Sequence, residues 1–306
     1  TPMILNPSNA GKFAGLYRLG ANYRDQWRSV TIPYQTSSVF GDLNIPLNRN
    51  KPRDRFGFGA AFVNDVAGDG KLHTTKAFVS VAYHKSFNKK NTVIGSVGYG
   101  ISLVQKKVDF SKLIFDAQWD DDHFDLGIPQ GEPFSDDRLN YLDMQAGINL
   151  SFAIGDESKM YVSGAMMHLT TPQESFYDDD NEIAMRPVVQ IGGLFSTYGS
   201  LMIEPHILYS SQRGAMEIIA GTNLLWRLNS GPEPTNKFIV GAWYRGVDAL
   251  IGVVGVEFKS LTVMGSYDVN LSKLSPASNS QGGFEISLIY IGDVKMKSGI
   301  ACPAFR

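Results

Sequence analysis

Apolar and polar side chains alternate with a period of two along most of this chain of 306 residues. The alternation is clear close to the C-terminal end, over residues 282–290. One face of this segment is apolar and holds Phe284, Ile286, Leu288 and Tyr290. The opposite face is polar and holds Glu285 and Ser287, with Ile289 as the single exception. A period of two predicts a strand between an apolar and an aqueous environment, either a soluble core facing water or lipid facing a hydrated lumen.

The first predicted strand, residues 17–27, favours lipid and lumen over a soluble core. Its apolar face holds Tyr17, Leu19, Ala21, Tyr23 and Trp27. Its opposite face holds Arg18, Asn22, Arg24 and Gln26. Two arginines on the inward face of a packed soluble core would be costly, whereas a hydrated lumen accommodates them. The first strand therefore indicates a transmembrane barrel.

The same alternation predicts about fourteen strands, the even number that single-chain outer-membrane barrels have. The predicted strands cover residues 17–27, 34–43, 56–62, 75–85, 93–103, 142–152, 160–169, 186–195, 203–210, 217–226, 238–245, 249–258, 261–268 and 282–290. The expected fold class is therefore all-β, a transmembrane antiparallel up-and-down β-barrel. We expect a lead-in over residues 1–12, the barrel over 13–292 and a periplasmic tail over 293–306.

The lengths of the predicted connections give a second indication of a barrel. If the first strand runs outward, the long loops fall on one side, beginning near Asp65, Lys107, Thr170 and Val269. Short turns fall on the other side, near Ser86, Ile154, Ser196 and Lys259. Long extracellular loops and short periplasmic turns are typical of outer-membrane barrels, although residues 44–54 and 227–236 make longer turns than this pattern requires.

Composition narrows the class further. Charged residues make up 19%, below the usual quarter for soluble domains, and the net charge of -2 gives no basic surface for nucleic acid. The one cysteine, Cys302, cannot form an internal disulfide. The longest apolar run, residues 249–256, is too short for a transmembrane helix. Numbering starts at Thr1 without a charged and then apolar stretch, so we expect any signal peptide to have been removed or left out.

Candidate chemistry is sparse. Motifs for a nucleophilic serine, a zinc-binding helix, a dinucleotide fold and a phosphate loop are absent from the sequence, so we expect neither an enzyme nor a cofactor. The acidic runs 120–122 and 178–180 offer oxygen ligands for calcium but lack the spacing of a calcium-binding loop. A solvated loop is the better interpretation of both runs.

The polar residues expected to face the lumen form the main candidate site. They are Arg18, Asn22, Arg24, Arg186, Glu204, His206, Glu217, Arg245, Glu257, Asp268 and Glu285. Charges of both signs predict ion pairs across the lumen that would fill and rigidify the barrel. The same charges could instead line a polar path for a solute or bind a partner, and the sequence does not choose between these roles.

Short motifs in a fixed order give a resemblance to the PorP/SprF family, outer-membrane proteins of the type IX secretion system of Bacteroidota. Residues 6–11, Asn-Pro-Ser-Asn-Ala-Gly, resemble the family's Asn-Pro-Ala-Tyr-Ala-Gly, from which Ser8 and Asn9 depart. Residues 23–27 resemble its Tyr-Arg-x-Gln-Trp, and further matches follow at 241–245, 248–250, 255–258, 266–268, 282–288 and 302–305. The residues that carry these motifs include Asn6, Pro7, Gly11, Trp27, Trp243 and Tyr267.

The resemblance implies an integral outer-membrane barrel that catalyses no reaction. It implies binding of a secreted protein's C-terminal sorting domain, of periplasmic secretion components, or of both. Protein secretion, surface attachment of adhesins and, in some members, gliding motility are the implied roles. The alternatives are an outer-membrane channel for small or hydrophobic solutes and a soluble β protein. Residues 281–288 also resemble the last-strand signal for barrel insertion, and this strand is expected to close the barrel against the strand that starts near Phe13.

Overall fold

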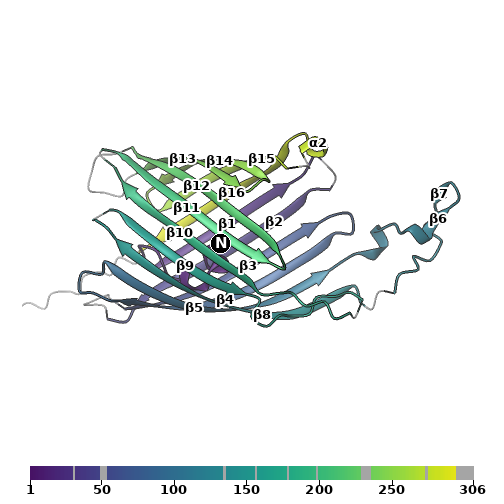
Figure 1. The fold of residues 1–306 in the computed structure, drawn as a ribbon, viewed down its shortest axis with the longest axis horizontal. Helices are drawn as coiled ribbons and strands as arrows, with labels where there is room; N and C mark the ends of the chain where they lie inside the picture. Colours follow the sequence, from purple (N-terminus) through teal and green to yellow (C-terminus); the bar gives the residue numbers. More distant parts are fainter. Residues whose placement is uncertain are drawn as a thin grey trace, which may run out of the picture.

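The computed structural model describes residues 1–29, 32–48, 54–133, 136–155, 157–177, 179–197, 199–228, 236–272 and 275–293. In this part of the chain, fourteen antiparallel strands form one closed barrel (Figure 1). The first seven barrel strands are β1 (Tyr17–Gln26), β2 (Tyr34–Pro46), β3 (Arg55–Ala67), β4 (Leu72–Ser86), β5 (Val93–Lys107), β8 (Arg138–Ala153) and β9 (Lys159–Met167). The other seven are β10 (Arg186–Ser196), β11 (Leu201–Gln212), β12 (Ala215–Arg227), β13 (Lys237–Arg245), β14 (Ala249–Phe258), β15 (Leu261–Asn270) and β16 (Gln281–Gly292).

The barrel is closed by pairing between the first and last strands, as the sequence predicted. The register of β1 against β16 runs from Tyr17 opposite Gly292 to Gln26 opposite Gly283. Every other pair joins strands that follow one another around the barrel. Closure leaves no barrel edge with unpaired backbone groups, which a lipid environment would penalise by several kcal/mol per group.

The two faces of each strand differ in the way that the alternation predicted. In β8, Asp143, Gln145 and Asn149 are buried in the interior, while Leu142 and Ile148 are exposed on the outer surface. This combination of an apolar exterior and a polar interior is the arrangement of a membrane barrel. Helices are short, and within the described ranges none has the length and apolar character to cross a membrane.

The long connections gather at one end of the barrel. This end carries residues 108–137, 168–185 and 271–280, the last of which includes helix α2 (Ser275–Ser278). The predicted loop from Asp65 is wrong in part, because β3 continues to Ala67 and only residues 68–71 connect it to β4. The opposite end carries the short turns 87–92, 154–158 and 259–260, and also residues 47–54 and 228–236.

The longest loop is not featureless. It contains two 3₁₀ turns, η2 (Phe110–Lys112) and η3 (Asp116–Gln118), and a small hairpin of β6 (Trp119–Asp120) and β7 (His123–Phe124). Figure 1 shows this hairpin standing well away from the barrel on the side of the long connections. Of the predicted tail at 293–306, only Asp293 belongs to the described residues, so Cys302 lies outside them.

Candidate functional site: the barrel interior

The N-terminal segment lies inside the barrel. It forms helix α1 (Pro2–Leu5) and the 3₁₀ turn η1 (Pro7–Asn9), and η1 packs against β4, β5 and β8. Figure 1 places the N-terminus among the strands. Met3 and Ala10 are fully buried in a cluster with Phe40, Phe78 and Ala82 of the wall. Residues 2–10 are therefore an internal plug on one side of the lumen.

Glycines of the wall make room for this plug. A Cβ atom on Gly57 of β3 would overlap with the carbonyl of Ala10, and one on Gly98 of β5 would overlap with the backbone of Ser8. On Gly147 of β8 it would overlap with the side chain of Asn6. Three strands thus carry a residue without a side chain where the plug approaches, because only glycine leaves room for so close a contact with the strand backbone.

Hydrogen bonds to polar wall residues fix the plug. The Gln145 amide donates to the carbonyls of Met3 and Ile4, at 3.2 and 3.1 Å. The Asn6 amide donates to the carbonyls of Ile148 and Gly164, each at 3.2 Å. Its Oδ1 accepts from the backbone and hydroxyl of Ser8, at 2.9 and 2.7 Å. These hydrogen bonds pair backbone carbonyls of the plug and of the wall with buried side-chain amides, which fixes the position of the plug.

A buried ion pair holds the end of the plug. Arg18 contacts both carboxylate oxygens of Asp42, at 2.9 and 2.7 Å, and the Asp42 side chain is completely buried. The same carboxylate accepts the backbone N–H of Gly11 at 2.8 Å. Gly11 has φ +70°, in the left-handed region that favours glycine. Next to this contact, a ring nitrogen of His84 lies 2.8 Å from the carbonyl oxygen of Ala10.

One interior ion network joins β1, β13, β15 and β16. Arg24 bonds Asp268 at 2.6 Å and Glu285 at 3.4 Å, and Arg245 reaches Asp268 at 3.3 Å. The Asn22 amide donates to Glu285 at 3.1 Å. Five residues from the predicted set therefore form a single network on the wall.

The other predicted residues lie in smaller groups. Arg186 pairs with Glu217 at 3.0 Å, and Glu257 pairs with Lys237 at 2.8 Å. Glu204 and His206 lie apart from these pairs and line an interior pocket. These interior pairs join strands that are neighbours or next neighbours in the barrel, so they run along the wall. The sequence had predicted pairs that cross the lumen, and these pairs do not cross it.

An interior pocket of about 190 Å³ contains Glu204 and His206. The His206 ring lies between Tyr161 and Trp243, with centroid distances of 6.2 and 5.8 Å. The Trp243 indole donates to Asn223 at 3.0 Å, and the Asn223 amide donates to Glu204 at 2.9 Å. Three rings and one carboxylate thus line a pocket whose polar atoms are already oriented.

Lys12 and two further cations lie at this end of the barrel without a carboxylate partner among the described residues. Lys12 follows the plug, and its Nζ lies 2.5 Å from Asn149 and 4.6 Å from the centroid of the Tyr161 ring. Arg55 and Lys159, the first residues of β3 and β9, lie within electrostatic range of Lys12. The Nε atom of Arg55 is buried without a hydrogen-bond partner. Mutual repulsion of these charges favours an anion at this mouth, which is the one with the short turns.

The motif residues divide between the plug, the pocket and the outer surface. Asn6, Pro7 and Gly11 belong to the plug and its end, and Trp243 lines the pocket. Trp27 follows β1 and contacts Tyr34 edge to face, with a centroid distance of 5.0 Å. Tyr267 is 47% exposed on the outer surface of β15.

The sequence did not single out several of the residues that build this site. Those residues are Lys12, Asp42, Arg55, Gln145, Lys159, Tyr161 and Asn223. Glycines at inward positions of β3, β5 and β8 are the signal that could have indicated an internal segment. They leave part of the barrel wall without side chains that would otherwise fill the lumen. No comparable signal joins Lys12 to Arg55 and Lys159, because they come from three distant parts of the chain.

Metal ligands do not gather in the described residues, where no group of three His, Cys, Asp or Glu side chains could hold an ion. Asp178 of the second acidic run lies outside those residues. In the first run, the Asp122 carboxylate lies 2.7 Å from a ring nitrogen of His123, and both side chains are exposed.

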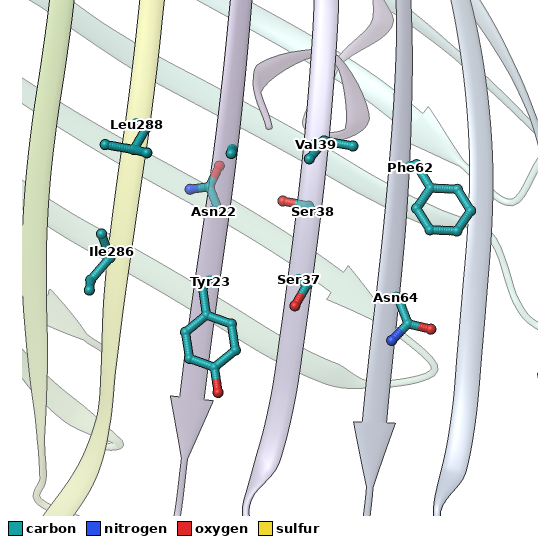
Figure 2. A pocket seen from close by; sticks show the side chains of 10 residues that line it. Asn22, Tyr23, Ser37, Ser38, Val39, Phe62, Asn64, Ile286 and Leu288 are labelled. Carbon is teal, nitrogen blue, oxygen red and sulfur yellow. The ribbon is translucent and has the colours of Figure 1, made fainter.

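The outer surface has a shallow groove of about 310 Å³ over β16, β1, β2 and β3 (Figure 2). Val39, Phe62, Ile286 and Leu288 form its apolar lining, and the small Ala21 leaves space between them. The groove crosses the seam between the first and last strands. It lies in the apolar outer surface, where lipid chains fill such depressions.

A closed antiparallel barrel with this exterior and interior defines the class of integral outer-membrane β-barrel proteins. The family model for the type IX secretion system membrane protein PorP/SprF matches residues 1–290. The chain therefore belongs to this family, as its motifs indicated. No curated protein matches it.

Solved structures similar to this chain are outer-membrane barrels. The toluene transporter TodX of Pseudomonas putida is 9% identical with a TM-score of 0.55, over 94% of this chain and 91% of that one. The toluene transporter TbuX of Ralstonia pickettii is 11% identical with a TM-score of 0.53, over 94% and 92%. A FadL homologue of Pseudomonas aeruginosa is 10% identical with a TM-score of 0.53, over 93% and 92%. At such identities the likeness shows the fold alone.

Proposed function

We propose that this barrel is a non-enzymatic binding component of type IX secretion. It binds the C-terminal sorting domain of a secreted adhesin, periplasmic secretion components, or both. Through that binding it supports protein secretion, attachment of the adhesin to the cell surface and gliding motility where the adhesin serves it. Membership of the PorP/SprF family supports the role in secretion.

The proposal rests on the positive charge at the mouth of the barrel beside the plug. Lys12, Arg55 and Lys159 place positive charge there, and none has a carboxylate partner among the described residues. The adjoining pocket offers aromatic surfaces from Tyr161 and Trp243. A polypeptide with acidic and aromatic side chains would neutralise the charges and fill the pocket.

The plug supports binding in preference to free passage. Its backbone is bonded to the wall through Gln145 and Asn6, and its apolar side chains are buried in the wall cluster. Moving it would expose Met3 and leave buried polar groups unpaired, at a cost of about 1–3 kcal/mol for each group. Because the plug fills one side of the lumen, the barrel is better suited to binding a partner than to passing a solute.

Copurification from native membranes tests the proposal. The wild-type barrel should recover sorting-domain proteins or periplasmic secretion components. Lys159→Glu should lower that recovery at least tenfold, because it replaces attraction by repulsion at the mouth. Lys89→Glu, in the turn 87–92 at the same end of the barrel, is the matched control and should leave the recovery unchanged. Recovery of neither partner class with the wild type would refute the proposal.

A channel for small or hydrophobic solutes is the second candidate. The pocket of Tyr161, His206 and Trp243 favours it, because aromatic rings bind apolar solutes. Uptake of monoaromatic solutes by liposomes containing the wild-type barrel would support this role. Tyr161→Ala should then change the uptake, whereas a purely protein-binding barrel should show no uptake above empty liposomes.

A further inference from the structure

The outer surface changes from apolar to cationic along three adjacent strands. On each of these strands, three successive outward-facing residues lead towards the end with the long connections. They are Ala77, Thr75 and His73 on β4, Leu103, Gln105 and Lys107 on β5, and Leu142, Asn140 and Arg138 on β8. Each strand thus passes from an apolar to a polar to a basic residue within five positions. This order marks where the lipid chains end and the headgroup layer begins.

The polar positions continue onto the neighbouring strands. Figure 2 shows Ser37 and Asn64 side by side, nearer to the arrowheads of β1 and β3 than Val39 and Phe62. Asn64 pairs across the strands with Thr75, whose hydroxyl donates to it at 3.3 Å. The Gln105 amide donates to Asn140 at 2.9 Å. These side chains satisfy one another, so the transition from apolar to polar is a built feature of the surface.

The basic residues beyond this transition lie directly opposite one another. Lys107 is the cross-strand partner of both His73 and Arg138. Like charges at directly opposite positions destabilise a sheet, so Lys107 beside Arg138 is unfavourable unless an anion neutralises the pair. All three side chains are exposed on the outer surface.

A cavity of about 480 Å³ opens beside these residues. Its lining includes Lys71, His73, Lys107 and Lys112, and two carboxylates, Asp109 and Asp137. Asp109 is engaged by Lys112 at 2.9 Å, whereas Asp137 lies 3.9 Å from Lys107, a looser contact. Lys71 and Arg138 have no carboxylate partner among the described residues. The cavity therefore keeps positive charge after its own acids are counted.

We propose that this surface binds the phosphate of an outer-leaflet lipid. Arg138 and Lys107 contact the phosphate from the strands, and Lys71 and Lys112 close over it from the loops. Arginine presents two parallel N–H groups that match phosphate oxygens, and lysine adds a point charge. The apolar residues Leu103 and Leu142 lie on the same strands, further from the long connections than Lys107 and Arg138. One lipid can therefore contact the leucines with its acyl chains and the cations with its phosphate.

Binding of defined lipids to the full chain in detergent micelles, measured by native mass spectrometry, tests the proposal. The probes are a bisphosphorylated lipid A, the same lipid after removal of its phosphates, and inorganic phosphate. We expect the phosphorylated lipid to bind at least tenfold more tightly than its dephosphorylated form. Inorganic phosphate at equal concentration should not displace it.

Three double variants complete the test. Lys107→Gln with Arg138→Gln should weaken binding of the phosphorylated lipid at least tenfold, and Lys107→Arg with Arg138→Lys should restore most of it. Lys89→Gln with Lys90→Gln, at the opposite end of the barrel, should have no effect. Folding of each variant is checked by its heat-dependent migration in gels. Equal binding of the two lipid forms, displacement by inorganic phosphate, or an unchanged affinity in the Gln variant would overturn the proposal.

Discussion

The carboxamide oxygen of Asn6 lies where a Cβ atom on Gly147 would have to be. The amide nitrogen of the same side chain donates to the carbonyl of Ile148, the next residue of β8. The plug and this strand therefore fit each other through one missing side chain and one hydrogen bond. Any residue other than glycine at position 147 must displace the plug or distort the wall.

Replacing Gly147 by Val should release the plug. Overpacking a close contact costs about 1–3 kcal/mol, and release also forfeits the bonds of Asn6. Amide hydrogen exchange of residues 2–10 should then rise tenfold or more, since exchange reports local opening. Gly265→Val is the matched control, because a Cβ there meets no atom within 4 Å. Unchanged protection of residues 2–10 in the Gly147 variant would show that the plug does not depend on this contact.

Breaking the buried ion pair should destabilise the barrel. Asp42→Ala leaves the Arg18 guanidinium buried with a carbonyl contact to Asn9 at 3.4 Å, and the Gly11 N–H loses its acceptor. Loss of one partner of a buried pair costs about 3–5 kcal/mol. Urea unfolding in lipid vesicles measures the difference in the free energy of unfolding.

The double variant Arg18→Met with Asp42→Leu separates charge burial from packing. It removes both charges and leaves only the unpaired Gly11 N–H, at about 1–3 kcal/mol. It should therefore be more stable than Asp42→Ala alone. If the double variant were the less stable of the two, the unpaired guanidinium would not be the main cost of Asp42→Ala, and the argument from the buried charge would fail.

Acid should loosen the contact between Asp54 and the end of β4. Asp54 accepts from Lys85 at 2.7 Å, from the Ser86 N–H at 3.2 Å and from the Tyr83 hydroxyl at 3.1 Å. The hydrogen bond from Lys85, followed by those from Ser86 and Tyr83, lowers the pKa of Asp54 below its ordinary value of 3.8. Because the folded state holds the ionised form, the stabilisation is complete above the ordinary pKa and is lost as pH falls through the lowered one.

The difference between the wild type and Asp54→Asn isolates this effect. Protection of the Ser86 amide against hydrogen exchange should be greater in the wild type at neutral pH. That advantage should vanish below the lowered pKa, where the carboxyl is neutral. An advantage that persists unchanged in strong acid would show that the charge of Asp54 has no part in it.

The strands could be predicted from the sequence because alternation is a local property. The predicted strand from Ala249 to Phe258 agrees with β14 at both ends, and the closing pair of β1 and β16 followed from the order of strands. Ile289, the exception in the last strand, was beyond local reasoning. It faces inward and packs on the cluster of Met3 and Phe40. An apolar residue fits at this inward position because the plug covers it.

Asp25, near the end of β1, is a second residue whose surroundings could not be predicted from the alternation. It occupies an outward position by alternation but is 1% exposed, because Arg28 and Gln35 donate to it at 2.7 and 3.2 Å. The partners lie after the strand and on the next one, where no period connects them. The interior site was hidden for this reason too, since Lys12, Arg55 and Lys159 meet only when the barrel closes.

Release of the plug should widen the path through the lumen. In planar bilayers, the wild-type barrel should give a small conductance, because residues 2–10 fill the side of the lumen next to β4, β5 and β8. Gly98→Val, whose Cβ would overlap with the backbone of Ser8, should give a larger single-channel conductance. Gly252→Val is the control, because a Cβ there lies in open space. If Gly98→Val exposes the plug to hydrogen exchange but leaves the conductance unchanged, the plug does not limit conduction through the lumen, and it serves instead to shape the mouth where a partner binds.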